Sequence, residues 1–405
     1  MKKLLLLLIP IAFPLLLAGP VGAAQSPARP EDALTAKARE FLTALEKGDF
    51  QLAVRDFDET MLKVSGPDKL EAMWKKQLPA QLGAFKKQAA ARRDELQGYE
   101  VVLVTCEFEK ATLDARVVFD KAGKIAGFGF VPTAPPAKYG PPAYADPAKF
   151  DETEVTVGSG EWALPGTLTM PRGDGPFPAL VLVHGSGPND RDESLGPNKP
   201  FKDLAWGLAT RGIAVLRYDK RSKVYGKKIV ADHKLEAAMT VKDETIDDAL
   251  AAAALLEKTR GIDPRRVFIL GHSLGGFLMP RIARAAEPLN VAGFISMAGL
   301  TRPLDDTIIR QMTYLYGLAG AAVSDEDKKK LEDLKSEVAK IKALTDADKG
   351  STTKLIGAMP TYWLDVRGYD PPETAKKVKR PMLILQGGRD YQVQTVDLEN
   401  WKKAL

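Results

Sequence analysis

The segment Gly271-His272-Ser273-Leu274-Gly275 is the part of this sequence whose residue types and spacing point most directly to chemistry. An apolar run at residues 267–270, typical of a buried strand, precedes it, and residues 277–286 can form a helix after it. A Gly-x-Ser-x-Gly turn between a strand and a helix is the pattern of a nucleophile elbow, which holds the serine hydroxyl clear of the sheet. The sequence therefore predicts that Ser273 is a nucleophile. The alternative is a glycine-rich turn in which the serine only caps the helix.

A serine nucleophile also needs donors for the oxyanion that forms on its substrate. The backbone N–H of Leu274, directly after the nucleophile, is expected to be one of them. The other is expected in the glycine-rich segment after the apolar strand at residues 178–183, where we assign the N–H of Ser186 first and that of Gly185 second. His184, at the end of that strand, is interpreted as a structural residue.

Asp390 is the predicted acid of the site. In enzymes built around such an elbow the acid follows the nucleophile along the chain, and the base follows the acid. Asp390 comes after an apolar strand at residues 381–386 and a Gly-Gly turn, where a carboxylate can point into the site. Asp305 and Asp306 are weaker alternatives, and an aspartate in an ordinary polar turn is the structural interpretation.

The base is missing from its expected place. The three histidines, His184, His233 and His272, all precede Asp390 in the chain. The C-terminal stretch gives a second indication that a part of the fold is missing. Residues 396–405 begin an amphipathic helix that no strand follows, and the strand at 381–386 would form an unprotected apolar edge. We therefore expect that the chain is C-terminally truncated and lacks a last strand and the catalytic histidine. A pseudoenzyme is the competing explanation.

The fold class predicted for residues 150–405 is α/β, with a mostly parallel sheet and helices on both faces. Strands are expected at residues 154–157, 164–170, 178–183, 213–218, 267–270, 291–298 and 381–386, and helices at 201–210, 240–260 and 277–286. Residues 302–366 interrupt this alternation with helices, one of which carries an apolar stripe from Leu331 to Leu344. This insert is predicted to form a cap over the active site.

Residues 31–131 are predicted to form a separate, small α+β domain. Helices are expected at residues 31–48, 50–61 and 68–91, the last broken near Pro79, and strands at 99–109, 111–119 and 125–131. Cys106 falls on the first of these strands and is expected to be a buried thiol. Six prolines predict that residues 132–149 are a stiff, extended linker.

The N-terminus predicts export. Lys2 and Lys3, an apolar run at residues 4–17 and the small residues before position 25 make residues 1–24 a secretory signal peptide. We therefore expect a periplasmic or extracellular protein with no stable membrane anchor after cleavage. The net charge of +5, or +3 without the two lysines, is too small to predict binding to nucleic acid. The single cysteine excludes an internal disulfide, and no histidine pair at ligand spacing predicts a metal or cofactor.

Residues 150–405 resemble the secreted bacterial α/β-hydrolase esterases of the dienelactone-hydrolase-like type. The matching segments are His184-Gly185-Ser186-Gly187-Pro188, Leu216-Arg217-Tyr218-Asp219-Lys220-Arg221, Gly271-His272-Ser273-Leu274-Gly275-Gly276, Tyr362-Trp363-Leu364-Asp365 and Leu385-Gln386-Gly387-Gly388-Arg389-Asp390-Tyr391-Gln392-Val393. The resemblance implies a carboxylesterase for small acyl esters, with Ser273 as nucleophile and Asp390 as acid. Residues 31–131 resemble the cone-shaped, nuclear-transport-factor-like domain of unknown function that precedes some secreted hydrolases.

Four further residues are candidates for substrate contact. Asp219 and Arg221 follow the strand at 213–218, at the end of the sheet where such folds place functional loops, and a structural ion pair is the other interpretation. Tyr362 and Trp363 belong to the predicted cap, where they line an acyl pocket or pack as ordinary cap residues.

Two other functions remain open at this point. A peptidase or amidase would use the same residues as an esterase. A non-catalytic envelope binding protein is the alternative if the chain truly ends at Leu405. The sequence does not indicate an oligomeric state.

Overall fold

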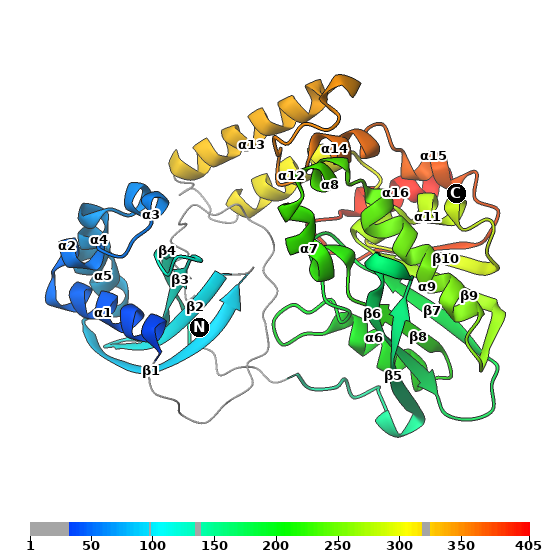
Figure 1. The fold of residues 1–405 in the computed structure, drawn as a ribbon, viewed down its shortest axis with the longest axis horizontal. Coiled ribbons are helices and arrows are strands. Elements are labelled where there is room, and N and C mark those ends of the chain that lie inside the picture. Colours follow the sequence, from blue (N-terminus) through cyan, green and yellow to red (C-terminus); the bar gives the residue numbers. More distant parts are fainter. Residues whose placement is uncertain (1–31, 97–98, 134–138, 318–324) are drawn as a thin grey trace. The chain divides into compact units, whose positions relative to one another are not determined.

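The computed structural model describes residues 32–96, 99–133, 139–317 and 325–405. The chain forms two compact units, of which the second begins at Gly140 (Figure 1). The predicted signal peptide, residues 1–24, lies outside the described residues. A search of the described residues finds no helix with the length and apolar character that a membrane span requires.

The first unit packs short helices against a four-stranded antiparallel sheet in the order β1-β2-β3-β4 (Figure 1). Its first helix is capped at its start by Asp32, whose carboxylate accepts the N–H groups of Leu34 and Thr35, and at its end by Gly48, where φ is +74°. The face carrying Phe41 and Leu42 is buried in the core of this unit. The helices are α1 (Ala33–Lys47), α2 (Phe50–Ala53), α3 (Glu59–Val64), α4 (Pro67–Ala72) and α5 (Leu78–Leu82), with the π-helical turn η1 (Met73–Gln77) before α5; the strands are β1 (Phe85–Leu96), β2 (Tyr99–Phe108), β3 (Thr112–Phe119) and β4 (Ile125–Pro132).

Strand β1 corrects the sequence prediction. The third helix was expected to continue to residue 91, but the helical region ends at Leu82 and residues 85–96 pair with β2 in an antiparallel ladder. Gly83, with φ at +74°, redirects the chain at this point. The residues from Lys86 to Arg93 are good helix formers without apolar alternation, so pairing with the buried strand β2 overrides their local preference.

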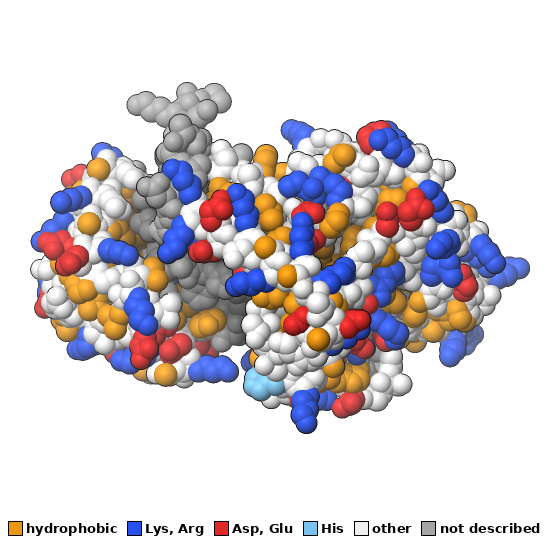
Figure 2. Space-filling view, turned by 90° about the horizontal axis from the view of Figure 1, so that it is seen from above, with side chains coloured by type: hydrophobic (Ala, Val, Ile, Leu, Met, Phe, Trp, Pro, Cys, Tyr) orange, Lys and Arg blue, Asp and Glu red, His pale blue; other side chains and the backbone are white. Residues whose placement is uncertain are grey.

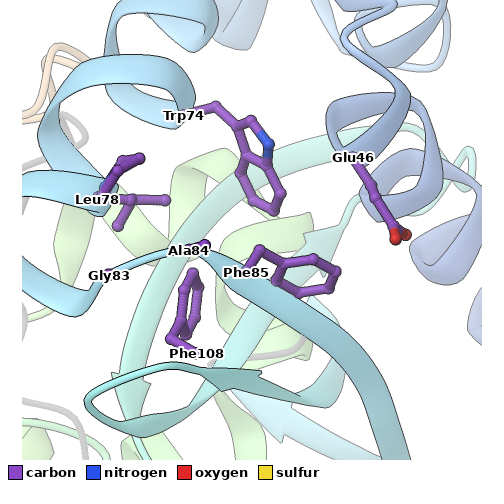
Figure 3. A pocket seen from close by; sticks show the side chains of 8 residues that line it. Glu46, Trp74, Leu78, Gly83, Ala84, Phe85 and Phe108 are labelled. Carbon is purple, nitrogen blue, oxygen red and sulfur yellow. The ribbon is translucent and has the colours of Figure 1, made fainter.

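A pocket of about 280 Å³ opens in this unit between α1, the α5 region and the start of β1. Figure 3 shows the rings of Trp74, Phe85 and Phe108 gathered on it, with Glu46 on α1 set apart from them. The ring centroids of Trp74 and Phe85 are 5.3 Å apart, and those of Phe85 and Phe108 are 5.6 Å apart. The lining holds no serine, cysteine or histidine.

Cys106 is fully buried on β2, as the sequence predicts. The pKa of its thiol is raised to about 12, chiefly by burial, with smaller contributions of opposite sign from the N–H of Ala115 and Arg39, which lower it, and from Asp114 and Glu46, which raise it. The native protein is therefore expected to show no reaction with dithiobis(nitrobenzoate) at pH 8, because the thiolate is the reactive form. The same assay in concentrated urea should release one equivalent of thionitrobenzoate, and rapid labelling of the native protein would contradict this burial.

The second unit contains a seven-stranded sheet in the order β11-β10-β9-β7-β8-β6-β5. The five strands from β11 to β8 are parallel, and β6 and β5 extend the sheet with antiparallel pairs. The strands are β5 (Phe150–Val157), β6 (Leu164–Pro171), β7 (Phe177–Val183), β8 (Ala214–Tyr218), β9 (Ile262–His272), β10 (Val291–Met297) and β11 (Met382–Leu385). The predicted α/β class with a mostly parallel sheet is confirmed.

Helices cover both faces of this sheet, because alternate residues of each strand point to opposite sides. Leu180 and Leu182 of β7 pack in one core with α6 (Pro200–Ala209). Val181 and Val183 pack in another core with α9 (Asp247–Glu257), α10 (Leu274–Phe277) and α11 (Met279–Ala285). Thr240 and Asp243 form a capping box before α9, since the N–H of Thr240 donates to Asp243 and the N–H of Asp243 donates to the Thr240 hydroxyl.

The insert between β10 and β11 is helical, as predicted. On its charged helix α13, Val338 and Ile341 of the predicted stripe are buried. The insert helices are α12 (Leu304–Gly317), α13 (Asp325–Ala343), α14 (Pro360–Val366) and α15 (Pro371–Ala375), with the short turn η6 (Asp346–Asp348). Helices that sequence reasoning missed are α7 (Arg221–Ala231) and α8 (His233–Ala238); the remaining elements are α16 (Thr395–Ala404), the π-helical turn η4 (Lys242–Ile246) and the 3₁₀ turns η2 (Pro147–Lys149) and η3 (Gly160–Trp162).

The last strand, β11, forms one edge of the sheet. Leu383 is 52% exposed and Leu385 is 40% exposed, so the apolar edge that the sequence predicts is present. The predicted linker differs from expectation in its second half, because residues from 140 on pack on the second unit, where the N–H of Asp146 donates to the hydroxyl of Thr210. Residues 134–138 of that linker lie outside the described residues.

The surface agrees with the small net charge. On the face that Figure 2 presents, lysine and arginine side chains are interspersed with aspartate and glutamate.

Candidate active site

Ser273 stands at the end of β9 with backbone angles of φ +51° and ψ −109°. A positive φ is costly for a residue with a Cβ atom, and it persists only where the surrounding structure imposes it. Here the N–H of Ser273 donates to the carbonyl oxygen of Met297 on the neighbouring strand at 2.9 Å, and α10 begins at the next residue. Strand, strained turn and helix thus follow one another as the sequence predicts for an elbow.

The two glycines of the elbow are required by space. A methyl group on Gly271 would lie 2.3 Å from the carbonyl carbon and oxygen of Gly275. A methyl group on Gly275 would lie 2.7 Å from the carbonyl oxygen of Val183. Helix and strand therefore approach each other at van der Waals distance around Ser273, which explains the Gly-x-Ser-x-Gly spacing.

The segment after β7 lies beside the nucleophile. A methyl group on Gly185 would lie 3.2 Å from the Cβ atom of Ser273. The N–H of Gly185, the second choice of oxyanion donor, donates to the Glu193 carboxylate at 2.7 Å and is therefore engaged within the protein. The N–H groups of Ser186 and Leu274 donate to no protein group within the described residues. These two donors are available to a substrate oxygen.

None of the three histidines is placed as a base by the described residues. His184 is buried, with its Nε2 atom 3.1 Å from the carbonyl oxygen of Asp190, and burial lowers its pKa to about 4. His233 is exposed at the start of α8. His272 precedes the nucleophile and pairs with Glu193, with His272 Nδ1 2.8 Å from Glu193 Oε2, although the contact lacks the direction of a hydrogen bond.

The electrostatic environment of His272 is acidic. Burial lowers its pKa, but Glu193 and Asp390 outweigh that effect, so the pKa lies above the ordinary value. For Glu193 burial acts in the other direction and raises the pKa. His272, His184 and the N–H of Gly185 together outweigh burial, so the pKa of Glu193 lies below the ordinary value. Sequence reasoning did not single out Glu193, because its partners are distant in the chain. Gly185 lies eight residues before it, and His272 ends strand β9.

Asp390 lies on the loop after β11, close enough to the elbow for its charge to act on His272. Its Oδ1 atom accepts the N–H groups of Gln392 at 2.8 Å and Val393 at 3.0 Å. These bonds hold the carboxylate in one orientation and leave Oδ2 without a hydrogen bond from the described residues. The weaker alternatives Asp305 and Asp306 lie on α12, where Asp306 pairs with Lys342.

Asp219 and Arg221 are both engaged in ion pairs within the protein. Asp219 pairs with Arg191 at 3.0 Å and also accepts the N–H of Arg191 at 2.8 Å. Arg221 pairs with Asp248. These contacts favour the structural interpretation of both residues over substrate contact.

Tyr362 and Trp363 of the insert differ in their surroundings. Trp363 is buried and donates its indole N–H to the carbonyl oxygen of Leu355, so it packs inside the insert. Tyr362 donates its hydroxyl to Glu244, which pairs with Lys220, and Lys220 donates to the carbonyl oxygen of Gly185. Through this chain of contacts the insert reaches the segment beside Ser273.

The insert also contacts the loop of Asp390. Gln311 of α12 donates its side-chain amide to the carbonyl oxygen of Gln392, and the rings of Tyr314 and Tyr391 stack with centroids 5.0 Å apart.

Among the described residues, no group of three histidine, cysteine, aspartate or glutamate side chains is arranged to hold a metal ion.

Comparison with known proteins identifies the family. The family model described as the alpha/beta hydrolase family matches residues 180–404. This chain belongs to the α/β-hydrolase family. The hydrolase is 38% identical to esterase EstD of Thermotoga maritima over 366 residues, which span 90% of this chain and 82% of that relative. A second model, described as a protein of unknown function (DUF3887), matches residues 38–128.

Two of the solved structures that match this chain are described as hydrolases. One is an esterase of Pyrococcus furiosus, with a TM-score of 0.41 and 17% identity, covering 63% of this chain and 77% of that one. Another, from Klebsiella pneumoniae subsp. pneumoniae, is described as a dienelactone hydrolase, with a TM-score of 0.36 and 16% identity, covering 63% and 80%. The family match and the esterase relative support hydrolase activity for this α/β hydrolase, and the predicted membership in this family is confirmed.

Proposed function

We propose that this α/β hydrolase is a serine esterase that cleaves carboxylic esters of small acyl groups through an acyl-enzyme on Ser273. The observation that supports this most is the strained elbow. In the elbow Ser273 directly precedes Leu274 and lies close to Gly185, and no group of the described residues uses the backbone N–H of Leu274 or of Ser186. This is the arrangement that acyl transfer requires, since negative charge develops on the carbonyl oxygen while the nucleophile attacks.

The proposed reaction has two halves. The Ser273 oxygen forms a bond to the ester carbonyl carbon while a base removes the hydroxyl proton, and the N–H groups of Leu274 and Ser186 stabilise the oxyanion. The C–O bond to the alcohol then breaks, and the alcohol leaves with that proton. Water attacks the acyl-enzyme in the same way and releases the acid. Asp390 orients the base, which in this proposal is a histidine.

The test is hydrolysis of matched p-nitrophenyl esters and p-nitroanilides by the natural protein, expressed from its complete coding sequence. We expect acetate and butyrate esters to be hydrolysed with a kcat/KM well above that of the matching anilides. Faster cleavage of the anilides would make the protein an amidase or peptidase. Saturable binding of the esters without any turnover would indicate the non-catalytic binding protein.

Export belongs to the same proposal, because the expected signal peptide places the esterase outside the cytoplasm. N-terminal sequencing of the protein purified from its natural host is expected to begin at residue 25. A mature protein that retains Met1 would contradict export by cleavage.

A further inference from the structure

Glu193 is a nearly buried carboxylate beside the elbow, with a side chain that is 10% exposed. Its φ of +50° lies in the left-handed region, where a residue with a Cβ atom is strained. The turn around it is held by Asp190, whose Oδ1 atom accepts the N–H groups of Asp192 and Ser194. Strained backbone of this kind clusters at functional sites, which indicates a functional role for Glu193.

The Glu193 carboxylate binds one side of Gly185. Its Oε1 atom accepts the N–H of Gly185 at 2.7 Å, while Oε2 lies 2.8 Å from His272 Nδ1. The carboxylate therefore connects the segment after β7 to the residue directly before the nucleophile.

The carbonyl of Gly185 is bound from the other side. It accepts the ammonium group of Lys220 at 2.9 Å and the side-chain amide of Asn189 at 3.2 Å. Lys220 is only 2% exposed, and its charge is paired with Glu244 at 3.2 Å. A buried, paired ammonium group of this kind has little freedom to move.

These contacts fix the peptide group between Gly185 and Ser186. A trans peptide is planar, so the N–H of Ser186 points away from the carbonyl oxygen of Gly185. Because Lys220 and Asn189 hold that oxygen, they also set the direction of the Ser186 N–H. The same peptide lies beside the nucleophile, since a methyl group on Gly185 would be 3.2 Å from the Cβ atom of Ser273.

We propose that Glu193 is the positioning residue of the oxyanion site. Its carboxylate, opposed by Lys220, holds Gly185 so that the following N–H, that of Ser186, is aimed at the substrate oxygen. The inference rests on the proposed function, because it assigns a role within the acyl transfer at Ser273. The pKa of Glu193 is lowered from its ordinary value despite burial, so the group is a carboxylate at neutral pH. The charged or titratable groups that act on it are His272 and His184, and Asp390 acts on His272.

The test compares three variants of the natural protein in p-nitrophenyl acetate hydrolysis. Glu193→Ala is expected to lower kcat by about 100-fold with little change in KM, because a misdirected oxyanion donor weakens only the transition state. Glu193→Gln is expected to recover most of this loss, since its amide oxygen still accepts the N–H of Gly185. Glu257→Ala is the matched control. It removes a carboxylate that accepts a loop N–H at the same 2.7 Å, but at Asn290, at the opposite end of β10 from the elbow.

Each outcome decides the inference. A Glu193→Ala variant with the wild-type kcat would overturn it, as would an equal loss of kcat in Glu193→Ala and Glu193→Gln. If Glu193→Ala does not fold, Glu193→Asp takes its place, because the shorter side chain withdraws the carboxylate from Gly185 and the same loss is expected. A wild-type protein that hydrolyses no ester would overturn the proposed function and this inference with it.

Discussion

Replacement of Ser273 by alanine is expected to reduce kcat for ester hydrolysis by about 10⁵-fold to 10⁶-fold, the size of effect found when a serine hydrolase loses its nucleophile. The variant keeps the N–H groups of Leu274 and Ser186, so substrate binding should change little. A small residual rate from oxyanion stabilisation is expected to remain. The measurement is the steady-state hydrolysis of p-nitrophenyl acetate by the natural protein and the variant.

The control for this prediction is Ser159→Ala, which removes the hydroxyl of an exposed serine in the loop between β5 and β6. It should retain the wild-type kcat and KM. If Ser273→Ala hydrolysed the ester at a rate within tenfold of the wild type, another group would be the nucleophile and the mechanism proposed for the elbow would be wrong.

Replacement of Arg217 by methionine is expected to destabilise the second unit by about 3–5 kcal/mol, because it removes the buried cationic partner of the buried Asp192 carboxylate. Arg217 on β8 is 2% exposed and pairs with Asp192 and Glu152. Asp192 is itself buried and precedes Glu193, so its release should also loosen the turn beside the elbow. The measurement is denaturant unfolding followed by tryptophan fluorescence, since four of the five tryptophans belong to residues 140–405.

Arg172→Met is the matched control, because Arg172 pairs with Asp151 on the same antiparallel part of the sheet but at the exposed surface. Exposed ion pairs contribute little to stability. The unfolding midpoint of this variant should stay close to that of the wild type. If the two substitutions lowered the unfolding midpoint equally, burial would not govern the contribution of Arg217 to stability.

The elbow could be predicted from the sequence because all of its signals are local. A buried apolar run, a tight turn with two glycines and a helix lie within about twenty residues, and no long-range contact is needed to recognise them. The alternation of strands and helices that predicts the parallel sheet is local in the same sense. The structure adds the reason for the glycines, which is the close approach of Gly271 to Gly275 and of Gly275 to Val183.

Features that depend on long-range contacts were missed. Strand β1 has a sequence of helix formers, and only its pairing with β2 makes it a strand. Glu193 has no motif of its own, because its importance comes from a backbone turn and from partners on two other segments. The same limit applies to Asp219. Its position after a strand is equally compatible with a functional loop and with a structural ion pair, and only the fold shows that it pairs with Arg191.

The most direct test of the serine esterase assignment is labelling of the natural protein with a fluorophosphonate, followed by mass spectrometry of its peptides. Such reagents phosphonylate a serine that is activated by a base and an oxyanion site. We predict one adduct, on Ser273, that blocks ester hydrolysis in proportion to labelling and is absent from Ser273→Ala. Full ester hydrolysis by a protein that carries no adduct at Ser273, or an inhibiting adduct on another residue, would contradict the assignment.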